Sequence, residues 1–280
     1  MEDIIHCPEE SNMRTAVILT GQERSLFKLY KHTRKNLLEP NNSTLFFACE
    51  ADNSDRIKGY FDGIEIGGAD IRNSSFRTPD FEAFANTLHS GGRPALMESV
   101  FQRTRPEPWH IGYVLHGASV LQYYQVLKAW LMVLEYEQKH KMRFDVVVRW
   151  RTDALITEKL DLSALFSQDE LTVRSLGSQR IREKITPSGL PMDRAVITLG
   201  MEQTWFAKRD VFALLGPMMY MYGFWDNGSK YAFNSETFFQ AFCDMNHITH
   251  WGFWQDPLFN ESYCNVNEVV SDPLVFSLVR

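Results

Sequence analysis

The stretch VVVRWRTD, from Val146 to Asp153, begins with three valines and continues with two arginines and an aspartate among its last five residues. An unbroken apolar run predicts a strand covered on both faces, as in a parallel sheet. Alternate side chains of a strand share a face, so Arg149, Arg151 and Asp153 are expected to point one way. Because buried charges need partners or a ligand, this pattern predicts a cleft at the carboxyl end of the strand. A surface ion-pair ladder on an edge strand is the competing interpretation.

The neighbouring segments predict an α/β fold. A helix is expected from about residue 117 to 140, because apolar residues recur there at spacings of three and four before the chain enters VVVRWRTD. Near the N-terminus, TAVILTG (15–21), a helix (25–40) and STLFFACEAD (43–52) predict strand, helix and strand. Strands joined by helices in this way predict a mostly parallel central sheet flanked by helices.

Further elements are predicted with less regular spacing. Short strands are expected in FDGIEIGG (61–68), ELTVRSL (170–176) and RAVITLG (194–200), and helices at 208–224 and 234–247. The pattern weakens between residues 52 and 109, where a lip over a site and an ordinary irregular loop are both consistent with the sequence. We expect one domain across residues 1–280.

Composition restricts the partners. The formal net charge of -6 gives no electrostatic reason to expect nucleic acid or an anionic membrane surface as partner. Four widely separated cysteines without a CxxC pair predict reduced thiols. The acidic first residues lack the features of a signal peptide, and no apolar run is long enough for a membrane span. These features predict a cytoplasmic protein.

Two other strand ends carry suggestive residues. In GQER (Gly21–Arg24), the glycine permits close backbone approach, Gln22 follows it, and Arg24 precedes a helix and suits a phosphate group. The second strand ends in Glu50 and Asp52, whose carboxylates suit ribose hydroxyls. Since ligands of α/β sheets gather at the carboxyl ends of strands, these residues are candidates for one site. An ordinary turn and a solvated acidic loop are the alternatives.

Taken together, the GQER strand end, the strand running into RWRTD, MDRAVITLG and the later WFAKRDVF resemble glycosyltransferases of the GT-A type. The pattern particularly resembles the small soluble enzymes encoded by large algal viruses (chloroviruses). It covers most of the chain from about Arg14. It implies a GT-A-like fold with a nucleotide-binding part at about 14–155 and an acceptor-side part at about 156–280. In that fold the first strand end holds the nucleotide.

The resemblance also implies an Asp-x-Asp motif that holds the donor diphosphate through a divalent metal. Here the corresponding residues are Arg151, Thr152 and Asp153, so an arginine replaces the first acid. Two interpretations compete. Asp153 binds Mn²⁺ or Mg²⁺ as a single carboxylate, or Arg149 or Arg151 neutralises the diphosphate directly and makes the metal weak or dispensable.

Inverting sugar transfer needs a base for the acceptor hydroxyl. Asp193 matches an acid that lies near donor and acceptor in the enzymes resembled. Glu236 is an equal candidate, although an acid in the first turn of a helix also has a purely structural explanation. Asp70 is the third candidate.

Aromatic side chains crowd the last third of the chain. Most are expected in the core, while one or two are candidates for a sugar-stacking platform. His247 and His250 are three residues apart, which suits a metal pair on a helix, but no third ligand is evident and helix-end histidines are favoured. The aromatic candidates are Trp205, Trp225, Trp251, Trp254, Tyr220, Tyr222 and Phe224.

The function expected is transfer of a monosaccharide from a UDP-sugar to a glycan acceptor, with xylose a candidate donor sugar and the host cytoplasm the location if the chain is viral. Two rivals remain. One is a non-catalytic glycan- or nucleotide-binding protein of the same fold, which the missing first acid favours. The other is a metal-dependent phosphohydrolase that uses Asp153 with other acids.

Overall fold

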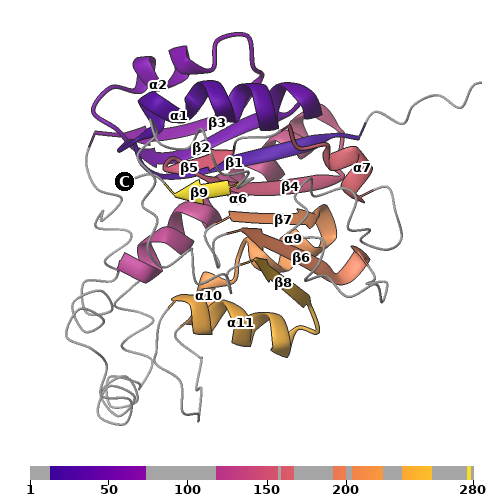
Figure 1. Cartoon of the computed structure of the whole chain (residues 1–280). Helices are drawn as coiled ribbons and strands as arrows, with labels where there is room; N and C mark the ends of the chain where they lie inside the picture. The colour runs from indigo at the N-terminus through magenta and orange to yellow at the C-terminus, as the bar shows by residue number, and fades with distance from the viewer. Residues whose placement is uncertain are drawn as a thin grey trace, which may run out of the picture.

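A seven-stranded sheet forms the centre of the fold, in the order β3-β2-β1-β4-β7-β6-β8 (Figure 1). The computed structural model describes residues 13–73, 118–156, 159–166, 192–199, 204–222, 235–253 and 276–278. The strands of the sheet are β1 (Thr15–Gln22), β2 (Thr44–Glu50), β3 (Ile66–Arg72), β4 (Val146–Arg151), β6 (Ala195–Leu199), β7 (Thr204–Lys208) and β8 (Thr249–Phe253). The α/β class predicted from the sequence is confirmed.

Strand direction is mostly parallel. β3, β2, β1 and β4 pair in parallel, and β6 pairs in parallel with β8. β7 is antiparallel to both of its neighbours, so β4 and β6 run in the same direction on either side of it. The carboxyl ends of β1, β2, β3, β4, β6 and β8 therefore meet at one edge of the sheet.

Helices cover both faces of the sheet. One face carries α6 (Ala118–His140), α9 (Arg209–Leu215) and α11 (Ser235–Met245), and the other carries α1 (Leu26–Thr33), α2 (Ser54–Tyr60) and α7 (Leu162–Phe166). The valines of β4 divide between these layers: Val147 packs in the cluster with α6, whereas Val146 and Val148 pack in the cluster with α1. The prediction that this strand is covered on both faces is confirmed.

Several boundaries differ from the sequence prediction. The helix expected at 25–40 is α1, continued by a π-helical turn η1 (Arg34–Leu38) and a short 3₁₀ turn η2 (Glu39–Asn41). The helix expected at 208–224 is wrong as one element, because it breaks at Gly216 and Pro217 into α9 and α10 (Met219–Tyr222). Pro217 has no backbone N–H to continue the helix, and Gly216 packs closely on α6, since a Cβ there would lie 2.5 Å from Trp130 Cγ.

Other elements were not predicted: α2, β7 and β8, together with the small antiparallel sheet of β5 (Ala154–Ile156) and β9 (Phe276–Leu278). The strand expected at 170–176 and residues 74–117 lie outside the described residues. Cys49 and Cys243 are buried free thiols, as expected. Within the described ranges, no helix has both the length and the apolarity needed to cross a bilayer.

Two buried asparagines position the segment that follows β4. Asn36 Nδ2 donates to the Ile156 carbonyl at 2.9 Å, and Asn41 Nδ2 donates to the Leu160 carbonyl at 2.8 Å. Asn41 Oδ1 also accepts the Leu162 amide at 2.8 Å. These bonds satisfy backbone groups that would otherwise be buried without partners. They attach β5, and with it the turn at Asp153, to the α1 layer.

The ends of β1 and β4 approach closely at Gly21. The backbone of Gly21 has φ +117°, and a Cβ there would lie 2.9 Å from Thr152 Oγ1. The Thr152 hydroxyl donates to the Gln22 carbonyl, and the Thr152 amide donates to the Thr20 carbonyl at 3.1 Å. A glycine is therefore required here both for its conformation and for the contact.

Gly21→Ala is expected to lower the free energy of unfolding by about 1–3 kcal/mol, because it combines a left-handed backbone with a steric contact. Gly59→Ala is the matched control. Gly59 lies in α2 with no atom within 4 Å of its added Cβ, so alanine is expected to leave stability unchanged or raise it by up to about 1 kcal/mol. Urea unfolding of both variants measures the difference, and equal values would contradict this role of Gly21.

Candidate functional site

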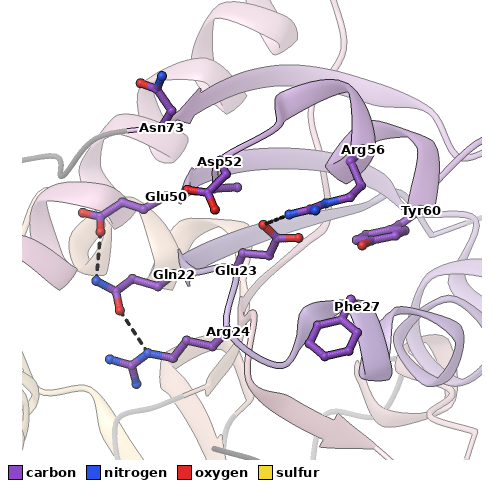
Figure 2. A pocket seen from close by; sticks show the side chains of 10 residues that line it. Gln22, Glu23, Arg24, Phe27, Glu50, Asp52, Arg56, Tyr60 and Asn73 are labelled. Carbon is purple, nitrogen blue, oxygen red and sulfur yellow. Dashed lines mark hydrogen bonds and ion pairs between the residues drawn. The ribbon is translucent and has the colours of Figure 1, made fainter.

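A cleft of about 660 Å³ opens at the carboxyl ends of β1 and β2. Its residues come from the ends of β1 and β2 and the turns after them, from α1 and α2, and from the residue after β3. In Figure 2, Gln22, Arg24 and Glu50 lie on one side of the cleft, and Glu23, Arg56, Phe27 and Tyr60 lie on the other. The lining residues are Gln22, Glu23, Arg24, Phe27, Glu50, Ala51, Asp52, Arg56, Tyr60 and Asn73.

The cleft lies beside the point where strand order reverses. From β1 the chain continues to β2 and β3 on one side, while β4 pairs with the other side of β1. In open α/β sheets such a switch point separates the loops of adjacent strands and leaves a crevice at their carboxyl ends. The predicted residues Gln22, Arg24, Glu50 and Asp52 line this cleft, and Gly21 lies next to them on β1.

A chain of polar contacts links three of the predicted residues. Gln22 Nε2 donates to Glu50 Oε2 at 3.0 Å, and Arg24 Nε donates to Gln22 Oε1 at 3.0 Å (Figure 2). Arg24 Nη1 lies 3.7 Å from Asp153 Oδ2. The ends of β2, β1 and β4 are thus connected through side chains. Gln22, the central link, orients both the carboxylate and the guanidinium.

Asp153 is held by a guanidinium fork. Arg151 Nε and Nη2 donate to the two carboxylate oxygens of Asp153, each at 2.7 Å. The Asp153 side chain is 2% exposed and that of Arg151 is 22% exposed, so the pair lies at the inner edge of the site. Bidentate pairing fixes the orientation of both groups.

The pKa of Asp153 reflects these contacts. Burial by itself raises the pKa of the carboxyl, but the hydrogen bonds from Arg151 and the charges of Arg151 and Arg24 outweigh that effect and leave the pKa below its ordinary value. The carboxylate is therefore ionised at neutral pH.

Arg149 differs from Arg151. Its side chain is buried, at 1% exposed, and its guanidinium carbon lies 4.5 Å from the centre of the Trp205 ring. Arg149 Nη2 also donates to Gln122 Oε1 at 3.2 Å. Stacking on an indole stabilises a buried guanidinium. Arg149 therefore lies behind the strand end, packed between β7 and α6.

One of the three predicted bases lies at the opposite edge of the sheet from Asp153, and a second is bound to an arginine. Register through β7 aligns Val196 of β6 with Val147 of β4, and Asp193 precedes Val196, so Asp193 is at the opposite edge of the sheet. At about 3.3 Å per residue, at least ~13 Å of strand separates the two levels. The expected position of Asp193 across a sugar from Asp153 is thus incompatible with the register. Asp70 lies on β3, level with Arg151 and three strand spacings or ~14 Å from β4, but its carboxylate is bound to Arg72 at 2.7 and 2.8 Å.

Glu236 lies in the first turn of α11, which begins at Ser235. A short connection joins the end of α11 to β8, with the Ile248 amide donating to the Cys243 carbonyl at 2.9 Å. Because β8 runs parallel to β6 and α11 packs back on β8, the start of α11 lies at the edge where β4 ends. The backbone of Glu236 thus lies at the same edge as Asp153, on the side of β8, which is three strand spacings from β4, as β3 is on the other side.

The aromatic and histidine candidates lie in different parts of the fold. Trp205 is a core residue, fully buried and stacked on Phe239 with ring centres 5.0 Å apart. Tyr220 is 49% exposed on α10. His247 follows α11 and His250 is in β8, so a helical pair of histidines is wrong. Trp225, Trp254 and Phe224 lie outside the described residues, and of Trp251 and Tyr222 the structure describes the backbone.

Six residues that line the cleft were not among the predicted site residues: Glu23, Phe27, Ala51, Arg56, Tyr60 and Asn73. Arg56 and Tyr60 belong to α2, Glu23 lies in the turn after β1, and Phe27 belongs to α1. Arg56 Nη2 pairs with Glu23 Oε2 at 2.6 Å, and Tyr60 stacks on Tyr30 with ring centres 4.6 Å apart. The spacing of four residues between Arg56 and Tyr60 is the available signal, since it puts both on one helix face.

No protein-family model and no curated protein matches this chain. The geometry of the site is therefore the basis for any functional assignment.

A divalent metal does not fit Asp153. Both carboxylate oxygens accept hydrogen bonds from Arg151, and Arg24 adds a second positive charge nearby. Across the ranges that the structure describes, no group of three or more His, Cys, Asp or Glu side chains is arranged to hold a metal ion. A metal at Asp153 would have to displace two charge-assisted hydrogen bonds.

A second cleft, of about 700 Å³, lies at the opposite edge of the sheet. Its charges are largely satisfied internally. Arg143 pairs with Asp210, and Arg209 forms a fork with Glu137 at 2.8 and 3.1 Å. The Arg209 guanidinium also stacks on Trp130. The contacts of Arg209 join α9 to α6, so helix packing accounts for these charges in the second cleft.

The fork predicts a pH-dependent stability. Because the folded-state pKa of Asp153 is depressed, its ionised form adds stability above the unfolded pKa of about 4, and this stability is lost as pH falls through the folded pKa. Asp153→Asn is expected to lower the free energy of unfolding by about 2 kcal/mol at pH 7. The difference from the parent should shrink below about pH 4.

Urea unfolding between about pH 7 and pH 3 measures this difference. Asp62→Asn is the matched control, since Asp62 is exposed and has no side-chain bond among the described residues. That variant is expected to stay within about 0.5 kcal/mol of the parent at each pH. A cost of Asp153→Asn that is constant with pH would contradict the role of the ionised fork.

Proposed function

We propose that the chain is a GT-A-like glycosyltransferase that moves a monosaccharide from a nucleotide sugar, expected to be a UDP-sugar, to a glycan hydroxyl. The observation that carries this proposal is the cleft beside the switch point, which Arg24, Glu50 and Asp52 line and where Arg24 reaches to 3.7 Å from Asp153. An arginine for phosphate and carboxylates for ribose hydroxyls are the groups that such a donor requires. The resemblance to the algal-virus enzymes agrees with this assignment and makes xylose a candidate sugar.

The sheet supports separate donor and acceptor sides. The cleft belongs to β1, β2 and α2, whereas Glu236 belongs to α11 beside β8 at the other end of the same edge. Asp153 lies between them, at the end of the central strand β4. A donor in the cleft would have its diphosphate at Arg24 and its sugar directed toward Asp153, facing the acceptor side.

The transfer that we propose inverts the configuration at the sugar. The acceptor oxygen attacks the anomeric carbon as the bond from that carbon to the diphosphate oxygen breaks, and the electron pair leaves with the nucleoside diphosphate. Glu236 takes the acceptor proton as base. Arg24 stabilises the charge that develops on the leaving diphosphate. Arg149, buried on Trp205, supports the strand end.

A second candidate is a non-catalytic nucleotide- or glycan-binding protein of the same fold. The fork at Asp153 favours it, because the acid expected to act on the donor is already bound to Arg151. Turnover distinguishes the two candidates, since both bind a nucleotide sugar. A metal-dependent phosphohydrolase is disfavoured by the poor fit of a metal at Asp153.

A panel of UDP- and GDP-sugars, including UDP-xylose, is expected to contain a donor that raises the melting temperature by about 5 °C at saturation. Arg24→Ala should abolish most of this shift by removing the phosphate contact. Arg143→Ala is the control, because Arg143 is an exposed arginine, 58% accessible, at the opposite edge. If no nucleotide sugar shifts the melting curve, the proposal is wrong.

Glu236→Gln is expected to reduce transfer by about 10²- to 10⁴-fold while binding of the nucleotide sugar stays unchanged, because the variant lacks the base but keeps its shape. Asp193→Asn is the matched control at the opposite edge and should retain parent activity. Release of the nucleoside diphosphate, measured with a mixture of glycan acceptors, gives the rates. Loss of activity in Asp193→Asn alone would contradict the assignment of Glu236.

A further inference from the structure

Arg151 occupies the place where the resemblance implies the first metal-binding acid. Its guanidinium engages both oxygens of Asp153 at 2.7 Å, which makes the pair electrically neutral. An acid at position 151 would instead give two adjacent negative charges. A divalent cation is attracted by accumulated negative charge and by oxygen ligands with unused lone pairs. With arginine in place of the acid, the pair at positions 151 and 153 offers neither.

Arg24 offers the positive charge that a metal would otherwise supply. Its side chain is 48% exposed, and Figure 2 shows its terminal nitrogens directed away from Gln22. Arg24 Nε is held by Gln22 at 3.0 Å, while Nη1 lies 3.7 Å from Asp153, a longer and weaker contact than that of Arg151. The guanidinium is therefore oriented, and its half-exposed side chain lines the cleft.

The backbone at Arg24 is also unusual. Its φ of 30° is a left-handed conformation that non-glycine residues rarely adopt. The turn is stabilised by the Glu23 amide, which donates to the Glu50 carbonyl at 2.7 Å, and by the Leu26 amide, which donates to the Glu23 carbonyl at 2.7 Å. Local strain that the surrounding bonds maintain is typical of functional sites. Here it directs the arginine to the end of β4.

We infer that this site binds the diphosphate of its nucleotide without a divalent metal, with Arg24 as the direct ligand and the Arg151–Asp153 pair holding that arginine in place. This inference rests on the proposed function and selects the metal-independent alternative. Asp153 is then a positioning residue, since its carboxylate acts on the arginines. Arginine suits the task because its planar fork pairs with two phosphate oxygens at once.

Binding of UDP, GDP, dTDP and ADP to the full chain tests the inference by isothermal titration calorimetry, with either EDTA or Mn²⁺ present. The nucleotide that binds is expected to have the same Kd in both conditions, within about twofold. Its monophosphate should bind more weakly, because Arg24 meets the second phosphate. Arg24→Ala is expected to raise the Kd by about 10- to 100-fold, and Arg143→Ala to leave it unchanged.

Arg151→Asp sharpens the test, because it recreates the spacing of two acids separated by Thr152. In this variant Mn²⁺ is expected to tighten nucleotide binding, whereas the neutral variant Arg151→Gln should gain no response to the metal. Circular dichroism identifies any variant that fails to fold, and the parent titrations decide the question without the variants.

The two proposals fail in different ways. If the parent binds a nucleoside diphosphate with Mn²⁺ and loses it in EDTA, the metal-independent inference is overturned while the proposed function survives. If none of the four nucleotides binds in either condition, both are overturned. Equal binding with EDTA and with Mn²⁺ supports the inference.

Discussion

Parallel pairing of β1 with β4 is the constraint on which the site depends. The register aligns Thr20 with Arg151, so the turns that follow the two strands lie against each other. Gly21 permits that approach, and the hydroxyl of Thr152 bonds the carbonyl of Gln22. A shift of one residue would reverse the faces of the side chains and separate Arg24 from Asp153. The hydrophobic clusters on both faces maintain this register, since the valines of β4 pack into both.

The three arginines at the strand ends become more exposed from the core to the cleft. Arg149 is buried on Trp205, Arg151 is partly exposed and bound to Asp153, and Arg24 is half-exposed. Each guanidinium is stabilised differently, by an aromatic face, by a carboxylate and by an amide oxygen. Burial of charge is tolerated where such partners exist. The outermost arginine consequently combines a defined orientation with access to an anionic ligand.

Much of the framework was predictable from the sequence. The helix at residues 118–140 and the strands at 15–22, 44–50 and 195–199 follow from their periodicity and β-branched residues, which reflect local burial. β7 and β8 were missed because five-residue strands resemble helix ends or loops when read alone. Gln22, Arg24, Glu50 and Asp52 were predicted as one site because parallel strands bring their carboxyl ends together, whereas Arg56 and Tyr60 depend on how α2 packs.

The sequence by itself determined that a buried strand ends in Arg149, Arg151 and Asp153 and that arginine stands where an acid was expected, because both facts follow from residue order and strand periodicity. Only the tertiary structure decided which charges meet. It separated Asp193 from Asp153, since β7 is antiparallel to both of its neighbours, so β6 runs in the same direction as β4 and starts at the far edge. It also bound Asp153 to Arg151 and directed Arg24 to the cleft. Such pairings depend on register and on the conformation of turns, which residue order leaves open.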